Sequence, residues 1–205
     1  NGITDFERVR FGVIPTGSGN DMARGLGITG NPTENLKRIL ACMQMDKAQC
    51  RTIDLGEVRY KGGETSRLFA ISSGLGLDAI VCKKALKSKL KDTLNKLHLG
   101  KLTYLLLTVQ TLFSMHTTNA SVRYEKKDTQ HFKEFIYIAA MNFKAEGGGV
   151  PMAPSADAAD GMLSMCSASG IPKWRTFFCL PFLVAAKHLL IRGFEVRDCA
   201  ECEIH

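Results

Sequence analysis

The sequence predicts an α+β fold, mainly an antiparallel β-sandwich with flanking helices, preceded by the strand, turn and helix of an α/β domain. Most segments after residue 50 alternate between apolar and polar residues, which is typical of half-buried strands. Three stretches among them have the apolar spacing of helices. Before residue 30 the order is instead strand, glycine turn and helix. We therefore expect a remnant of the α/β domain at residues 1–28 and a second domain at residues 29–205.

The expected N-terminal elements follow from apolar spacing and cap residues. An apolar strand at Arg8–Ile14 leads into the turn, and Gly19–Asp21 supplies cap-type residues for a helix from Met22 to about Leu26. A second helix is expected at about Asn31–Met45, because asparagine, proline and threonine begin it. Its apolar residues are spaced to form one buried face: Leu36, Ile39, Leu40 and Met43.

The remaining elements are mostly strands bounded by turn residues. Strands are expected at Arg51–Tyr60, Ser66–Gly74, Asn119–Lys126, Phe132–Asn142, Met162–Ala168 and Gly193–Ile204. Helices are expected at about Asp78–Lys91, Lys101–Met115 and Lys173–Leu190, the last kinked by Pro181. The apolar stretches inside the last two helices are too short to span a bilayer. They fit core helices, or a wall that contacts an acyl chain, and both interpretations stay open.

Composition narrows the class of protein. With 205 residues, 45% of them hydrophobic, the chain can bury a core. It begins without Met and without the pattern of a signal peptide, so we expect a cytoplasmic protein of which this is a fragment. Its seven cysteines indicate reduced thiols. Cys199 and Cys202 have the gap of a zinc knuckle or redox pair, but thiols on an alternating strand are the favoured interpretation.

The charge favours an acidic partner. The formal net charge is +7, and the densest basic run, Lys83–Lys101, contains one acid, Asp92. No aromatic residue interrupts that run and no common nucleic-acid motif is present, so no nucleic-acid partner is expected. Two interpretations of the run stay open: a solvated helix face, or a surface that meets an anionic membrane.

The stretch VIPTGSGNDMARGLGI, residues 13–28, has the composition of a phosphate-binding turn. Glycines at Gly17 and Gly19 permit positive φ and let the backbone approach a ligand closely. The following helix directs free N–H groups and the positive end of its dipole to the same place. Thr16, Ser18 and Asn20 then become candidate hydrogen-bond donors, and Asp21 a candidate partner of Mg²⁺. Glycine required for steric reasons alone is the other interpretation.

A second cluster of polar and glycine residues lies in NFKAEGGGVPMAPSADAADGMLSM, residues 142–165. Gly147–Gly149 offers an open backbone ahead of a loop that carries Asp157 and Asp160. Two carboxylates three residues apart, with Gly161 next, permit an oxygen-ligated cation. An ordinary Asp-Gly turn before a strand is the alternative.

Both segments resemble the diacylglycerol kinase catalytic family, in particular its bacterial soluble lipid kinases. The family motif Pro-Thr-Gly-Thr-x-Asn-Asp-Phe-Ala-Arg is close to PTGSGNDMAR at residues 15–24, with Ser18 in place of Thr and Met22 in place of Phe. The late Ala-Pro…Asp-Asp-Gly segment resembles APSADAADGML at residues 153–163. FAISSGLGLDAIV at residues 69–81 and GKLTYLL at residues 100–106 also match in order, so the resemblance covers nearly the whole chain.

The resemblance implies the chemistry and the roles of these residues. Family enzymes transfer the γ-phosphate of ATP to a lipid hydroxyl, commonly that of diacylglycerol, with Mg²⁺. Thr16, Gly17, Asn20 and Asp21 would line the cleft between a nucleotide-binding domain and a β-sandwich, with Asp21 in the acidic network around the catalytic Mg²⁺. Asp157, Asp160 and the carbonyl of Met162 match positions that hold a structural Mg²⁺.

Two family motifs are missing from this sequence. A Gly-Gly-Asp-Gly-Thr motif, which binds nucleotide phosphates, is expected before Asn1, and an Asp-Gly-Glu motif with the general base is expected beyond His205. We therefore expect a lipid kinase as the parent protein and an inactive fragment. The basic run and the apolar helices would then meet the inner, anionic face of the membrane as a peripheral protein, and an open sheet edge would allow a homodimer.

Two rival functions stay open, and so does the identity of the lipid. The first rival is a kinase of a soluble metabolite, like NAD kinases and phosphofructokinases, and the second is a non-catalytic β-rich binding module. Diacylglycerol, phosphatidylglycerol, a sphingoid base and an undecaprenyl-type alcohol are all compatible with the sequence.

Overall fold

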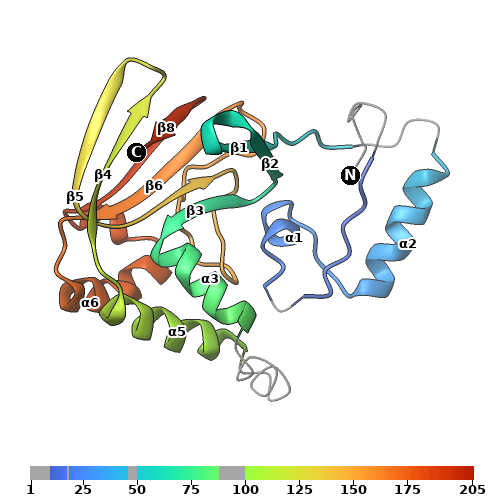
Figure 1. The fold of residues 1–205 in the computed structure, drawn as a ribbon. Coiled ribbons are helices and arrows are strands. Elements are labelled where there is room, and N and C mark those ends of the chain that lie inside the picture. Colours follow the sequence, from blue (N-terminus) through green and yellow to red (C-terminus); the bar gives the residue numbers. More distant parts are fainter. Residues whose placement is uncertain (1–9, 18, 46–49, 88–99) are drawn as a thin grey trace.

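The computed structural model describes residues 10–17, 19–45, 50–87 and 100–205 and has the α+β fold with antiparallel sheets that the sequence predicts (Figure 1). The main sheet has six strands in the order β7-β6-β5-β4-β8, with β3 paired to β5, and every pairing is antiparallel. Its strands are β3 (Ser72–Gly76), β4 (Thr118–Tyr124), β5 (Asp128–Met141), β6 (Leu163–Ser169), β7 (Phe194–Cys199) and β8 (Cys202–Ile204).

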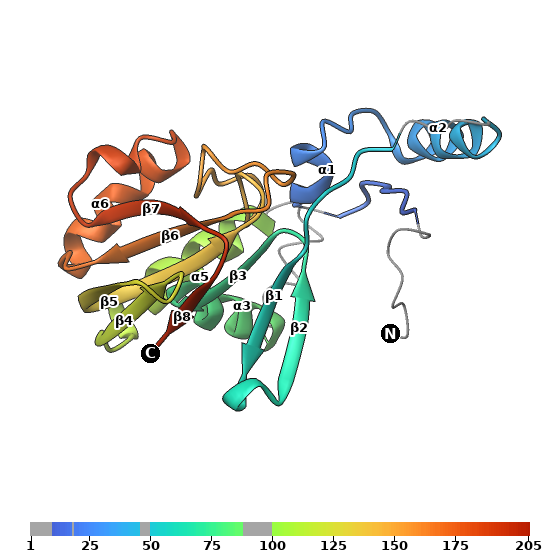
Figure 2. The same cartoon turned by 90° about the horizontal axis from the view of Figure 1, so that it is seen from above.

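A separate hairpin projects from this body (Figure 2). It consists of β1 (Gly56–Tyr60) and β2 (Thr65–Phe69), joined through the short turn helix η2 (Lys61–Gly63). Gly62 and Gly63 both have positive φ, 67° and 94°, which explains two successive glycines in the turn.

Three helices cover one face of the sheet: α3 (Leu77–Lys87), α5 (Gly100–Ser114) and α6 (Lys173–Val184) (Figure 1). The largest core cluster lies between them and the sheet. It joins Val81 of α3, Leu112 of α5 and Cys179 of α6 to Ile136 and Met141 of β5. A smaller cluster around Val122, Ile138 and Met165 lies on the opposite face. Strand β5 contributes side chains to both clusters, and its residues 135–139 are buried without interruption, next to a register shift between Phe135 and Tyr137.

Two helices precede the sheet. Helix α1 (Asp21–Gly25) lies close to it, and α2 (Pro32–Met43) stands farther away (Figure 1). Asn31 and Glu34 form a capping box at the start of α2, as the cap residues predict. The predicted buried face of α2 is wrong for three of its four residues: Leu36, Leu40 and Met43 are 45%, 51% and 76% exposed, whereas Ile39 is half-buried beside Gly12. Amphipathic spacing shows that a helix has an apolar side, but burial needs a partner, and none of the described elements covers this side.

Several predicted boundaries need correction. Of the strand predicted at Arg8–Ile14, residues 8–9 lie outside the described residues, and no strand forms at residues 10–14, because no described strand lies beside them to complete a ladder. The strand predicted at residues 66–74 is divided between β2 and β3, which belong to different sheets. The helix predicted at residues 173–190 ends at Val184, three residues after Pro181, and a turn helix η3 (His188–Leu190) follows. The last strand is interrupted at residues 200–201, between Cys199 and Cys202.

The division into domains at residue 29 stays a prediction. None of the described helices is long and apolar enough to cross a bilayer.

Candidate functional site

The glycine turn closes on itself before α1 begins. The Asn20 amide donates to the carbonyl of Gly17 at 2.6 Å, and its oxygen accepts from the Gly17 amide at 2.8 Å. Asn20 has φ 54°, the left-handed region that asparagine tolerates better than most residues. Asn20 therefore shapes the turn, and neither its amide nor that of Gly17 points freely at a ligand. Thr16 is exposed, whereas Ser18 lies outside the described residues.

Asp21 joins this turn to the loop between β5 and β6. Its Oδ2 accepts a hydrogen bond from the backbone N–H of Gly148 at 2.8 Å, although the two residues are far apart in the sequence. Its Oδ1 accepts from Arg24 Nη1 at 2.8 Å, and Arg24 Nη2 donates to the Gly19 carbonyl at 3.0 Å. The Asp21 side chain is 11% exposed, and that of Arg24 is 49% exposed. Thus the two glycine-rich segments that the sequence singled out meet at one carboxylate.

Close backbone approach explains two of the glycines at this meeting. A Cβ on Gly149, which has φ +98°, would stand 2.5 Å from Arg24 Nη1. A Cβ on Gly25 would overlap the ring of Phe143, so α1 can lie against that ring only because residue 25 has no side chain. We call the contact region of Gly17–Gly25 with Glu146–Gly149 the glycine junction.

Two further carboxyl groups lie near the glycine junction, and burial changes their acidity. Burial raises the pKa of Glu146 to about 7, with further contributions from Asp78 and Asp21, while a hydrogen bond from Ser72 opposes the shift. Burial also raises the pKa of Asp78, against a hydrogen bond from Cys82. Glu146 thus lies within electrostatic reach of both Asp78 and Asp21, and this negative surrounding favours its protonated form. Sequence reasoning missed Asp78 and Glu146, because the fold alone brings them to Asp21.

A hollow of about 310 Å³ lies beside the glycine turn. It is lined by Pro15, Asn20, Ala23 and Arg24 together with residues 27–30. Arg24 provides a cation at its wall and pairs with Asp21, while no acidic residue is among the described residues that line the hollow. A nucleotide phosphate would find a complementary charge there.

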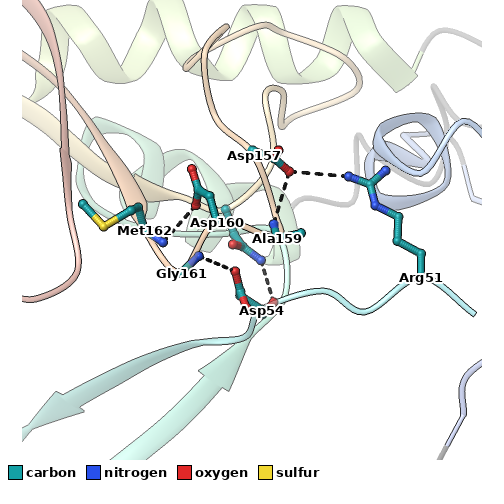
Figure 3. A network of polar contacts seen from close by, with 8 residues as sticks. Arg51, Asp54, Asp157, Ala159, Asp160, Gly161 and Met162 are labelled. Atoms are coloured by element: carbon teal, nitrogen blue, oxygen red, sulfur yellow. Dashed lines mark hydrogen bonds and ion pairs between the residues drawn. The ribbon is translucent and has the colours of Figure 1, made fainter.

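The second predicted site is a loop network around three aspartates (Figure 3). Asp160 Oδ1 accepts from the Met162 amide at 2.9 Å, and Asp157 Oδ1 accepts from the Ala159 amide at 3.2 Å. Asp157 also faces the guanidinium of Arg51 at 3.5 Å. Asp54, which sequence reasoning missed, accepts from the Gly161 amide at 2.7 Å. These contacts hold residues 157–162 in a tight series of turns before β6.

The oxygen atoms of this loop are of the type that binds magnesium, but not all of the carboxylates are oriented to share one ion. Two carboxylates and the carbonyl of Met162 are hard oxygen donors. However, Figure 3 shows the Asp157 carboxylate turned toward Arg51 and that of Asp160 toward the Met162 amide. A cation at this loop would have to replace Arg51 as the partner of Asp157. Within the described part of the chain, no group of three or more His, Cys, Asp or Glu side chains could hold a metal ion. Cys199 and Cys202 are therefore not part of such a group.

The chain resembles two families of known proteins, in the order of the sequence. Residues 1–58 match the diacylglycerol kinase catalytic domain, and residues 71–205 match the YegS C-terminal NAD kinase beta sandwich-like domain. A diacylglycerol kinase of Bacillus subtilis is 30% identical over 166 residues, which are 80% of this chain and 48% of that protein. YtlR of the same organism is 25% identical over 204 residues, which are 97% of this chain and 63% of YtlR.

Solved structures share the fold. The crystal structure of a diacylglycerol kinase from Bacillus anthracis matches with a TM-score of 0.60 at 19% identity, covering 94% of this chain and 56% of that one. At this identity the likeness concerns the fold. The chain spans between about half and two thirds of the length of these relatives.

Proposed function

Because the chain belongs to the family of the YegS C-terminal NAD kinase beta sandwich-like domain, and its residues 1–58 match the diacylglycerol kinase catalytic domain, we propose that the whole protein transfers the γ-phosphate of ATP to the hydroxyl group of a membrane lipid. Diacylglycerol or a similar lipid alcohol is the proposed acceptor. The protein would act with Mg²⁺ as a peripheral enzyme at the anionic inner face of the membrane.

One observation carries this proposal: the glycine junction places Asp21 against the Gly148 amide. This contact joins the family-like motif at residues 15–24 to the glycine-rich segment that precedes the late motif at residues 153–163. It also lies beside a hollow with a cationic wall, which suits phosphate oxygens. A turn that kept its glycines for steric reasons alone would not need a charged side chain at its contact with a distant loop.

The residues of this chain would act by positioning. Thr16, Gly17, Ser18 and Asn20 would line the phosphate end of the nucleotide, with Asn20 fixing the backbone path of the turn. Asp21 would keep its charge toward the cation, while Arg24 and the Gly148 amide hold its carboxylate in one orientation. Bound magnesium would neutralise charge on the transferring phosphoryl group. Asp157, Asp160 and Met162 would hold a second, structural magnesium.

The test is a phosphoryl-transfer assay on the full-length protein with radiolabelled ATP and mixed vesicles that contain several lipid alcohols. We expect label in one lipid, and a loss of at least about 100-fold in Asp21→Asn, because the charge at the phosphoryl group is removed. Asp128→Asn is the matched control: Asp128 pairs with Arg197 on the exposed β4–β5 turn, and its loss should leave transfer unchanged.

Each outcome of that assay selects a function. Label in no lipid, but in a small hydroxylated metabolite, would replace this proposal with a soluble-substrate kinase. Label in neither a lipid nor a metabolite would favour the non-catalytic β-rich binding module. Equal activity of Asp21→Asn and Asp128→Asn would show that the glycine junction is not the site.

A further inference from the structure

The helices that cover the sheet carry an apolar outer surface. Each of its large hydrophobic side chains is at least 36% exposed. We call this surface the outer helical face, and its apolar members are Ile80 and Leu86 on α3, Leu105, Leu106 and Phe113 on α5, and Trp174, Phe177, Phe178, Phe182 and Val184 on α6. Contiguous exposed apolar surface of this kind marks a contact with a partner or a membrane.

Helix α6 shows most clearly that this face is organised. Trp174, Phe178 and Phe182 lie at i, i+4 and i+8 and are 62%, 64% and 49% exposed, whereas Thr176 and Cys179 on the other side are buried. A helix on a protein surface normally directs its apolar stripe inward. Ring contacts continue the stripe onto α5: Phe177 lies 5.3 Å from Phe178 and 6.2 Å from Phe113 between ring centroids.

The charges on these helices are positive with one exception. The chain contains 20 Asp and Glu residues, yet α3, α5 and α6 together contain one, Asp78, which interacts electrostatically with Glu146 of the glycine junction. The same helices contain six basic residues: Lys83, Lys84, Lys87, Lys101, Lys173 and Arg175. Lys173 is engaged, since it donates to the carbonyls of Phe113 and Met115. Among the described residues, no carboxylate lies within ion-pair distance of Lys83, Lys87 or Arg175.

A groove of about 440 Å³ between α3 and α5 combines the two features. Lys83, Lys84 and Lys87 line it together with Ile80, Leu107 and Gln110. Ammonium groups beside an apolar floor would suit a molecule that has an anionic group and a hydrocarbon chain, as an anionic phospholipid does. A protein partner with an acidic, apolar helix would share only part of this chemistry, because aromatic residues with flanking lysines are typical of the membrane interface.

We propose that the outer helical face docks on an anionic lipid bilayer. Trp174, Phe178 and Phe182 enter the boundary between headgroups and acyl chains, and Lys83, Lys84 and Lys87 meet the lipid phosphates. The proposal rests on the proposed function in one respect: a lipid kinase has to meet a substrate that stays in the bilayer. The docking proposal goes further than that function, because it names the face that meets the membrane. Docking itself needs neither ATP nor an acceptor lipid.

The chain contains its own reporter, because Trp174 is its one tryptophan. We would mix the 205-residue chain with vesicles of phosphatidylcholine alone or with about a third phosphatidylglycerol, and record Trp174 emission and its quenching by brominated acyl chains. We expect a blue shift and quenching with the anionic vesicles. Lys83→Glu with Lys87→Glu should weaken binding by about 30-fold. Phe178→Ser with Phe182→Ser should reduce binding and quenching together.

Matched controls come from surfaces away from this face. Leu68→Ser removes an exposed apolar residue from the β1–β2 hairpin, and Lys126→Glu with Lys127→Glu reverses two charges on the β4–β5 turn. Both should bind vesicles like the unmodified chain. Loss in the controls equal to that in the test variants would overturn the proposal, as would unquenched Trp174 at saturating anionic vesicles.

Two other results would overturn the docking face without touching the proposed kinase activity. A blue-shifted Trp174 in a dimer without vesicles would show that a second copy of the chain covers the face. Full activity of the Phe178→Ser, Phe182→Ser protein on vesicle-bound acceptor would show that another surface docks. Conversely, the protein could bind vesicles but phosphorylate no lipid, whether the lipid is supplied in detergent or in vesicles. That result would overturn the proposed kinase activity and leave the docking face standing.

Discussion

At the scale of single residues, the glycine junction depends on the absence of one methyl group. The Arg24 guanidinium occupies the place where a Cβ on Gly149 would stand, and the same guanidinium holds Asp21. Gly149→Ala should therefore displace Arg24, reduce phosphoryl transfer at least about tenfold and lower the free energy of unfolding by about 2 kcal/mol. Transfer assays and denaturant unfolding of the full-length protein measure both effects.

Gly147→Ala separates crowding from backbone strain. Gly147 also has positive φ, +63°, but a Cβ there would meet nothing within 4 Å. In this control the free energy of unfolding should fall by about 1 kcal/mol, and phosphoryl transfer should be unchanged. If the two variants lost equal activity, the contact between Arg24 and the loop would not matter for transfer.

Glu146 makes folding stability depend on pH. The folded chain keeps a proton on Glu146 up to about pH 7, whereas an exposed glutamate releases it near 4.5. The folded state thus binds more protons between these values, so this group makes the protein less stable as pH rises from 4.5 to 7. Glu146→Gln, which bears no charge at any pH, should be more stable than the unmodified chain at pH 8 by up to about 3 kcal/mol.

The difference between the two proteins is the quantity to measure, because other carboxyl groups titrate in the same range. Urea unfolding at pH 5 and pH 8 should show a small difference at pH 5 and the full difference at pH 8. An equal difference at both values would contradict the raised pKa. Loss of stability in the variant at pH 8 would show that the Glu146 carboxylate is held by a favourable contact.

At the scale of elements, Asn142 ties three segments together at the end of β5. Its buried amide donates to the carbonyls of Asp54, before β1, and Ala70, between β2 and β3, at 2.7 and 2.9 Å. Asn142→Ala should lower the free energy of unfolding by about 2–3 kcal/mol, since two carbonyls lose their partner. Thermal and urea unfolding measure this loss.

Exposed Asn119, at the edge of β4, provides the comparison for Asn142. Asn119→Ala should change stability by less than about 0.5 kcal/mol. Asn142→Ala should also loosen the Asp54 contact with Gly161 and so disturb the aspartate loop. If both variants unfolded alike, the amide contacts of Asn142 would have no net effect.

At the scale of the whole molecule, the aspartate loop should link cation binding to stability. Magnesium that binds only the folded chain raises its stability, by about 2.7 kcal/mol at a concentration 100 times Kd. We expect the Tm to rise with added Mg²⁺, and Asp160→Asn to abolish the rise. Arg51→Gln should strengthen it, because Arg51 no longer competes for Asp157.

An effect of Mg²⁺ that persists in Asp160→Asn would place the cation elsewhere. Glu203→Gln, on an exposed carboxylate paired with Arg123 far from the loop, serves as the control and should respond like the unmodified chain. Equal responses of all variants to Ca²⁺, Mg²⁺ and NaCl would indicate general screening of charge.

The sequence by itself determined the α+β class, most helices and strands, and the two motifs that carry the family. These features are local: Asn31 and Glu34 cap α2 from three residues apart, and Gly62 and Gly63 mark the turn of the β1–β2 hairpin. Asp21 was recognisable for the same reason, because its motif is contiguous. The break at Ala200–Glu201 and the separation of β2 from β3 were not recognisable from the sequence, since they depend on which strands pair with each other.

Only the tertiary structure decided which carboxyl groups lie together and which apolar faces are covered. Asp78, Glu146 and Asp54 join the candidate sites from distant segments, and no spacing along the chain indicates such contacts. Likewise, helical periodicity predicts an apolar stripe on α2 and on α6, yet both stripes remain exposed. Periodicity is a property of one helix, whereas burial is a property of two surfaces. The sequence therefore left open whether the apolar helices form the core or a membrane-facing wall, and only the structure shows which of their side chains are exposed.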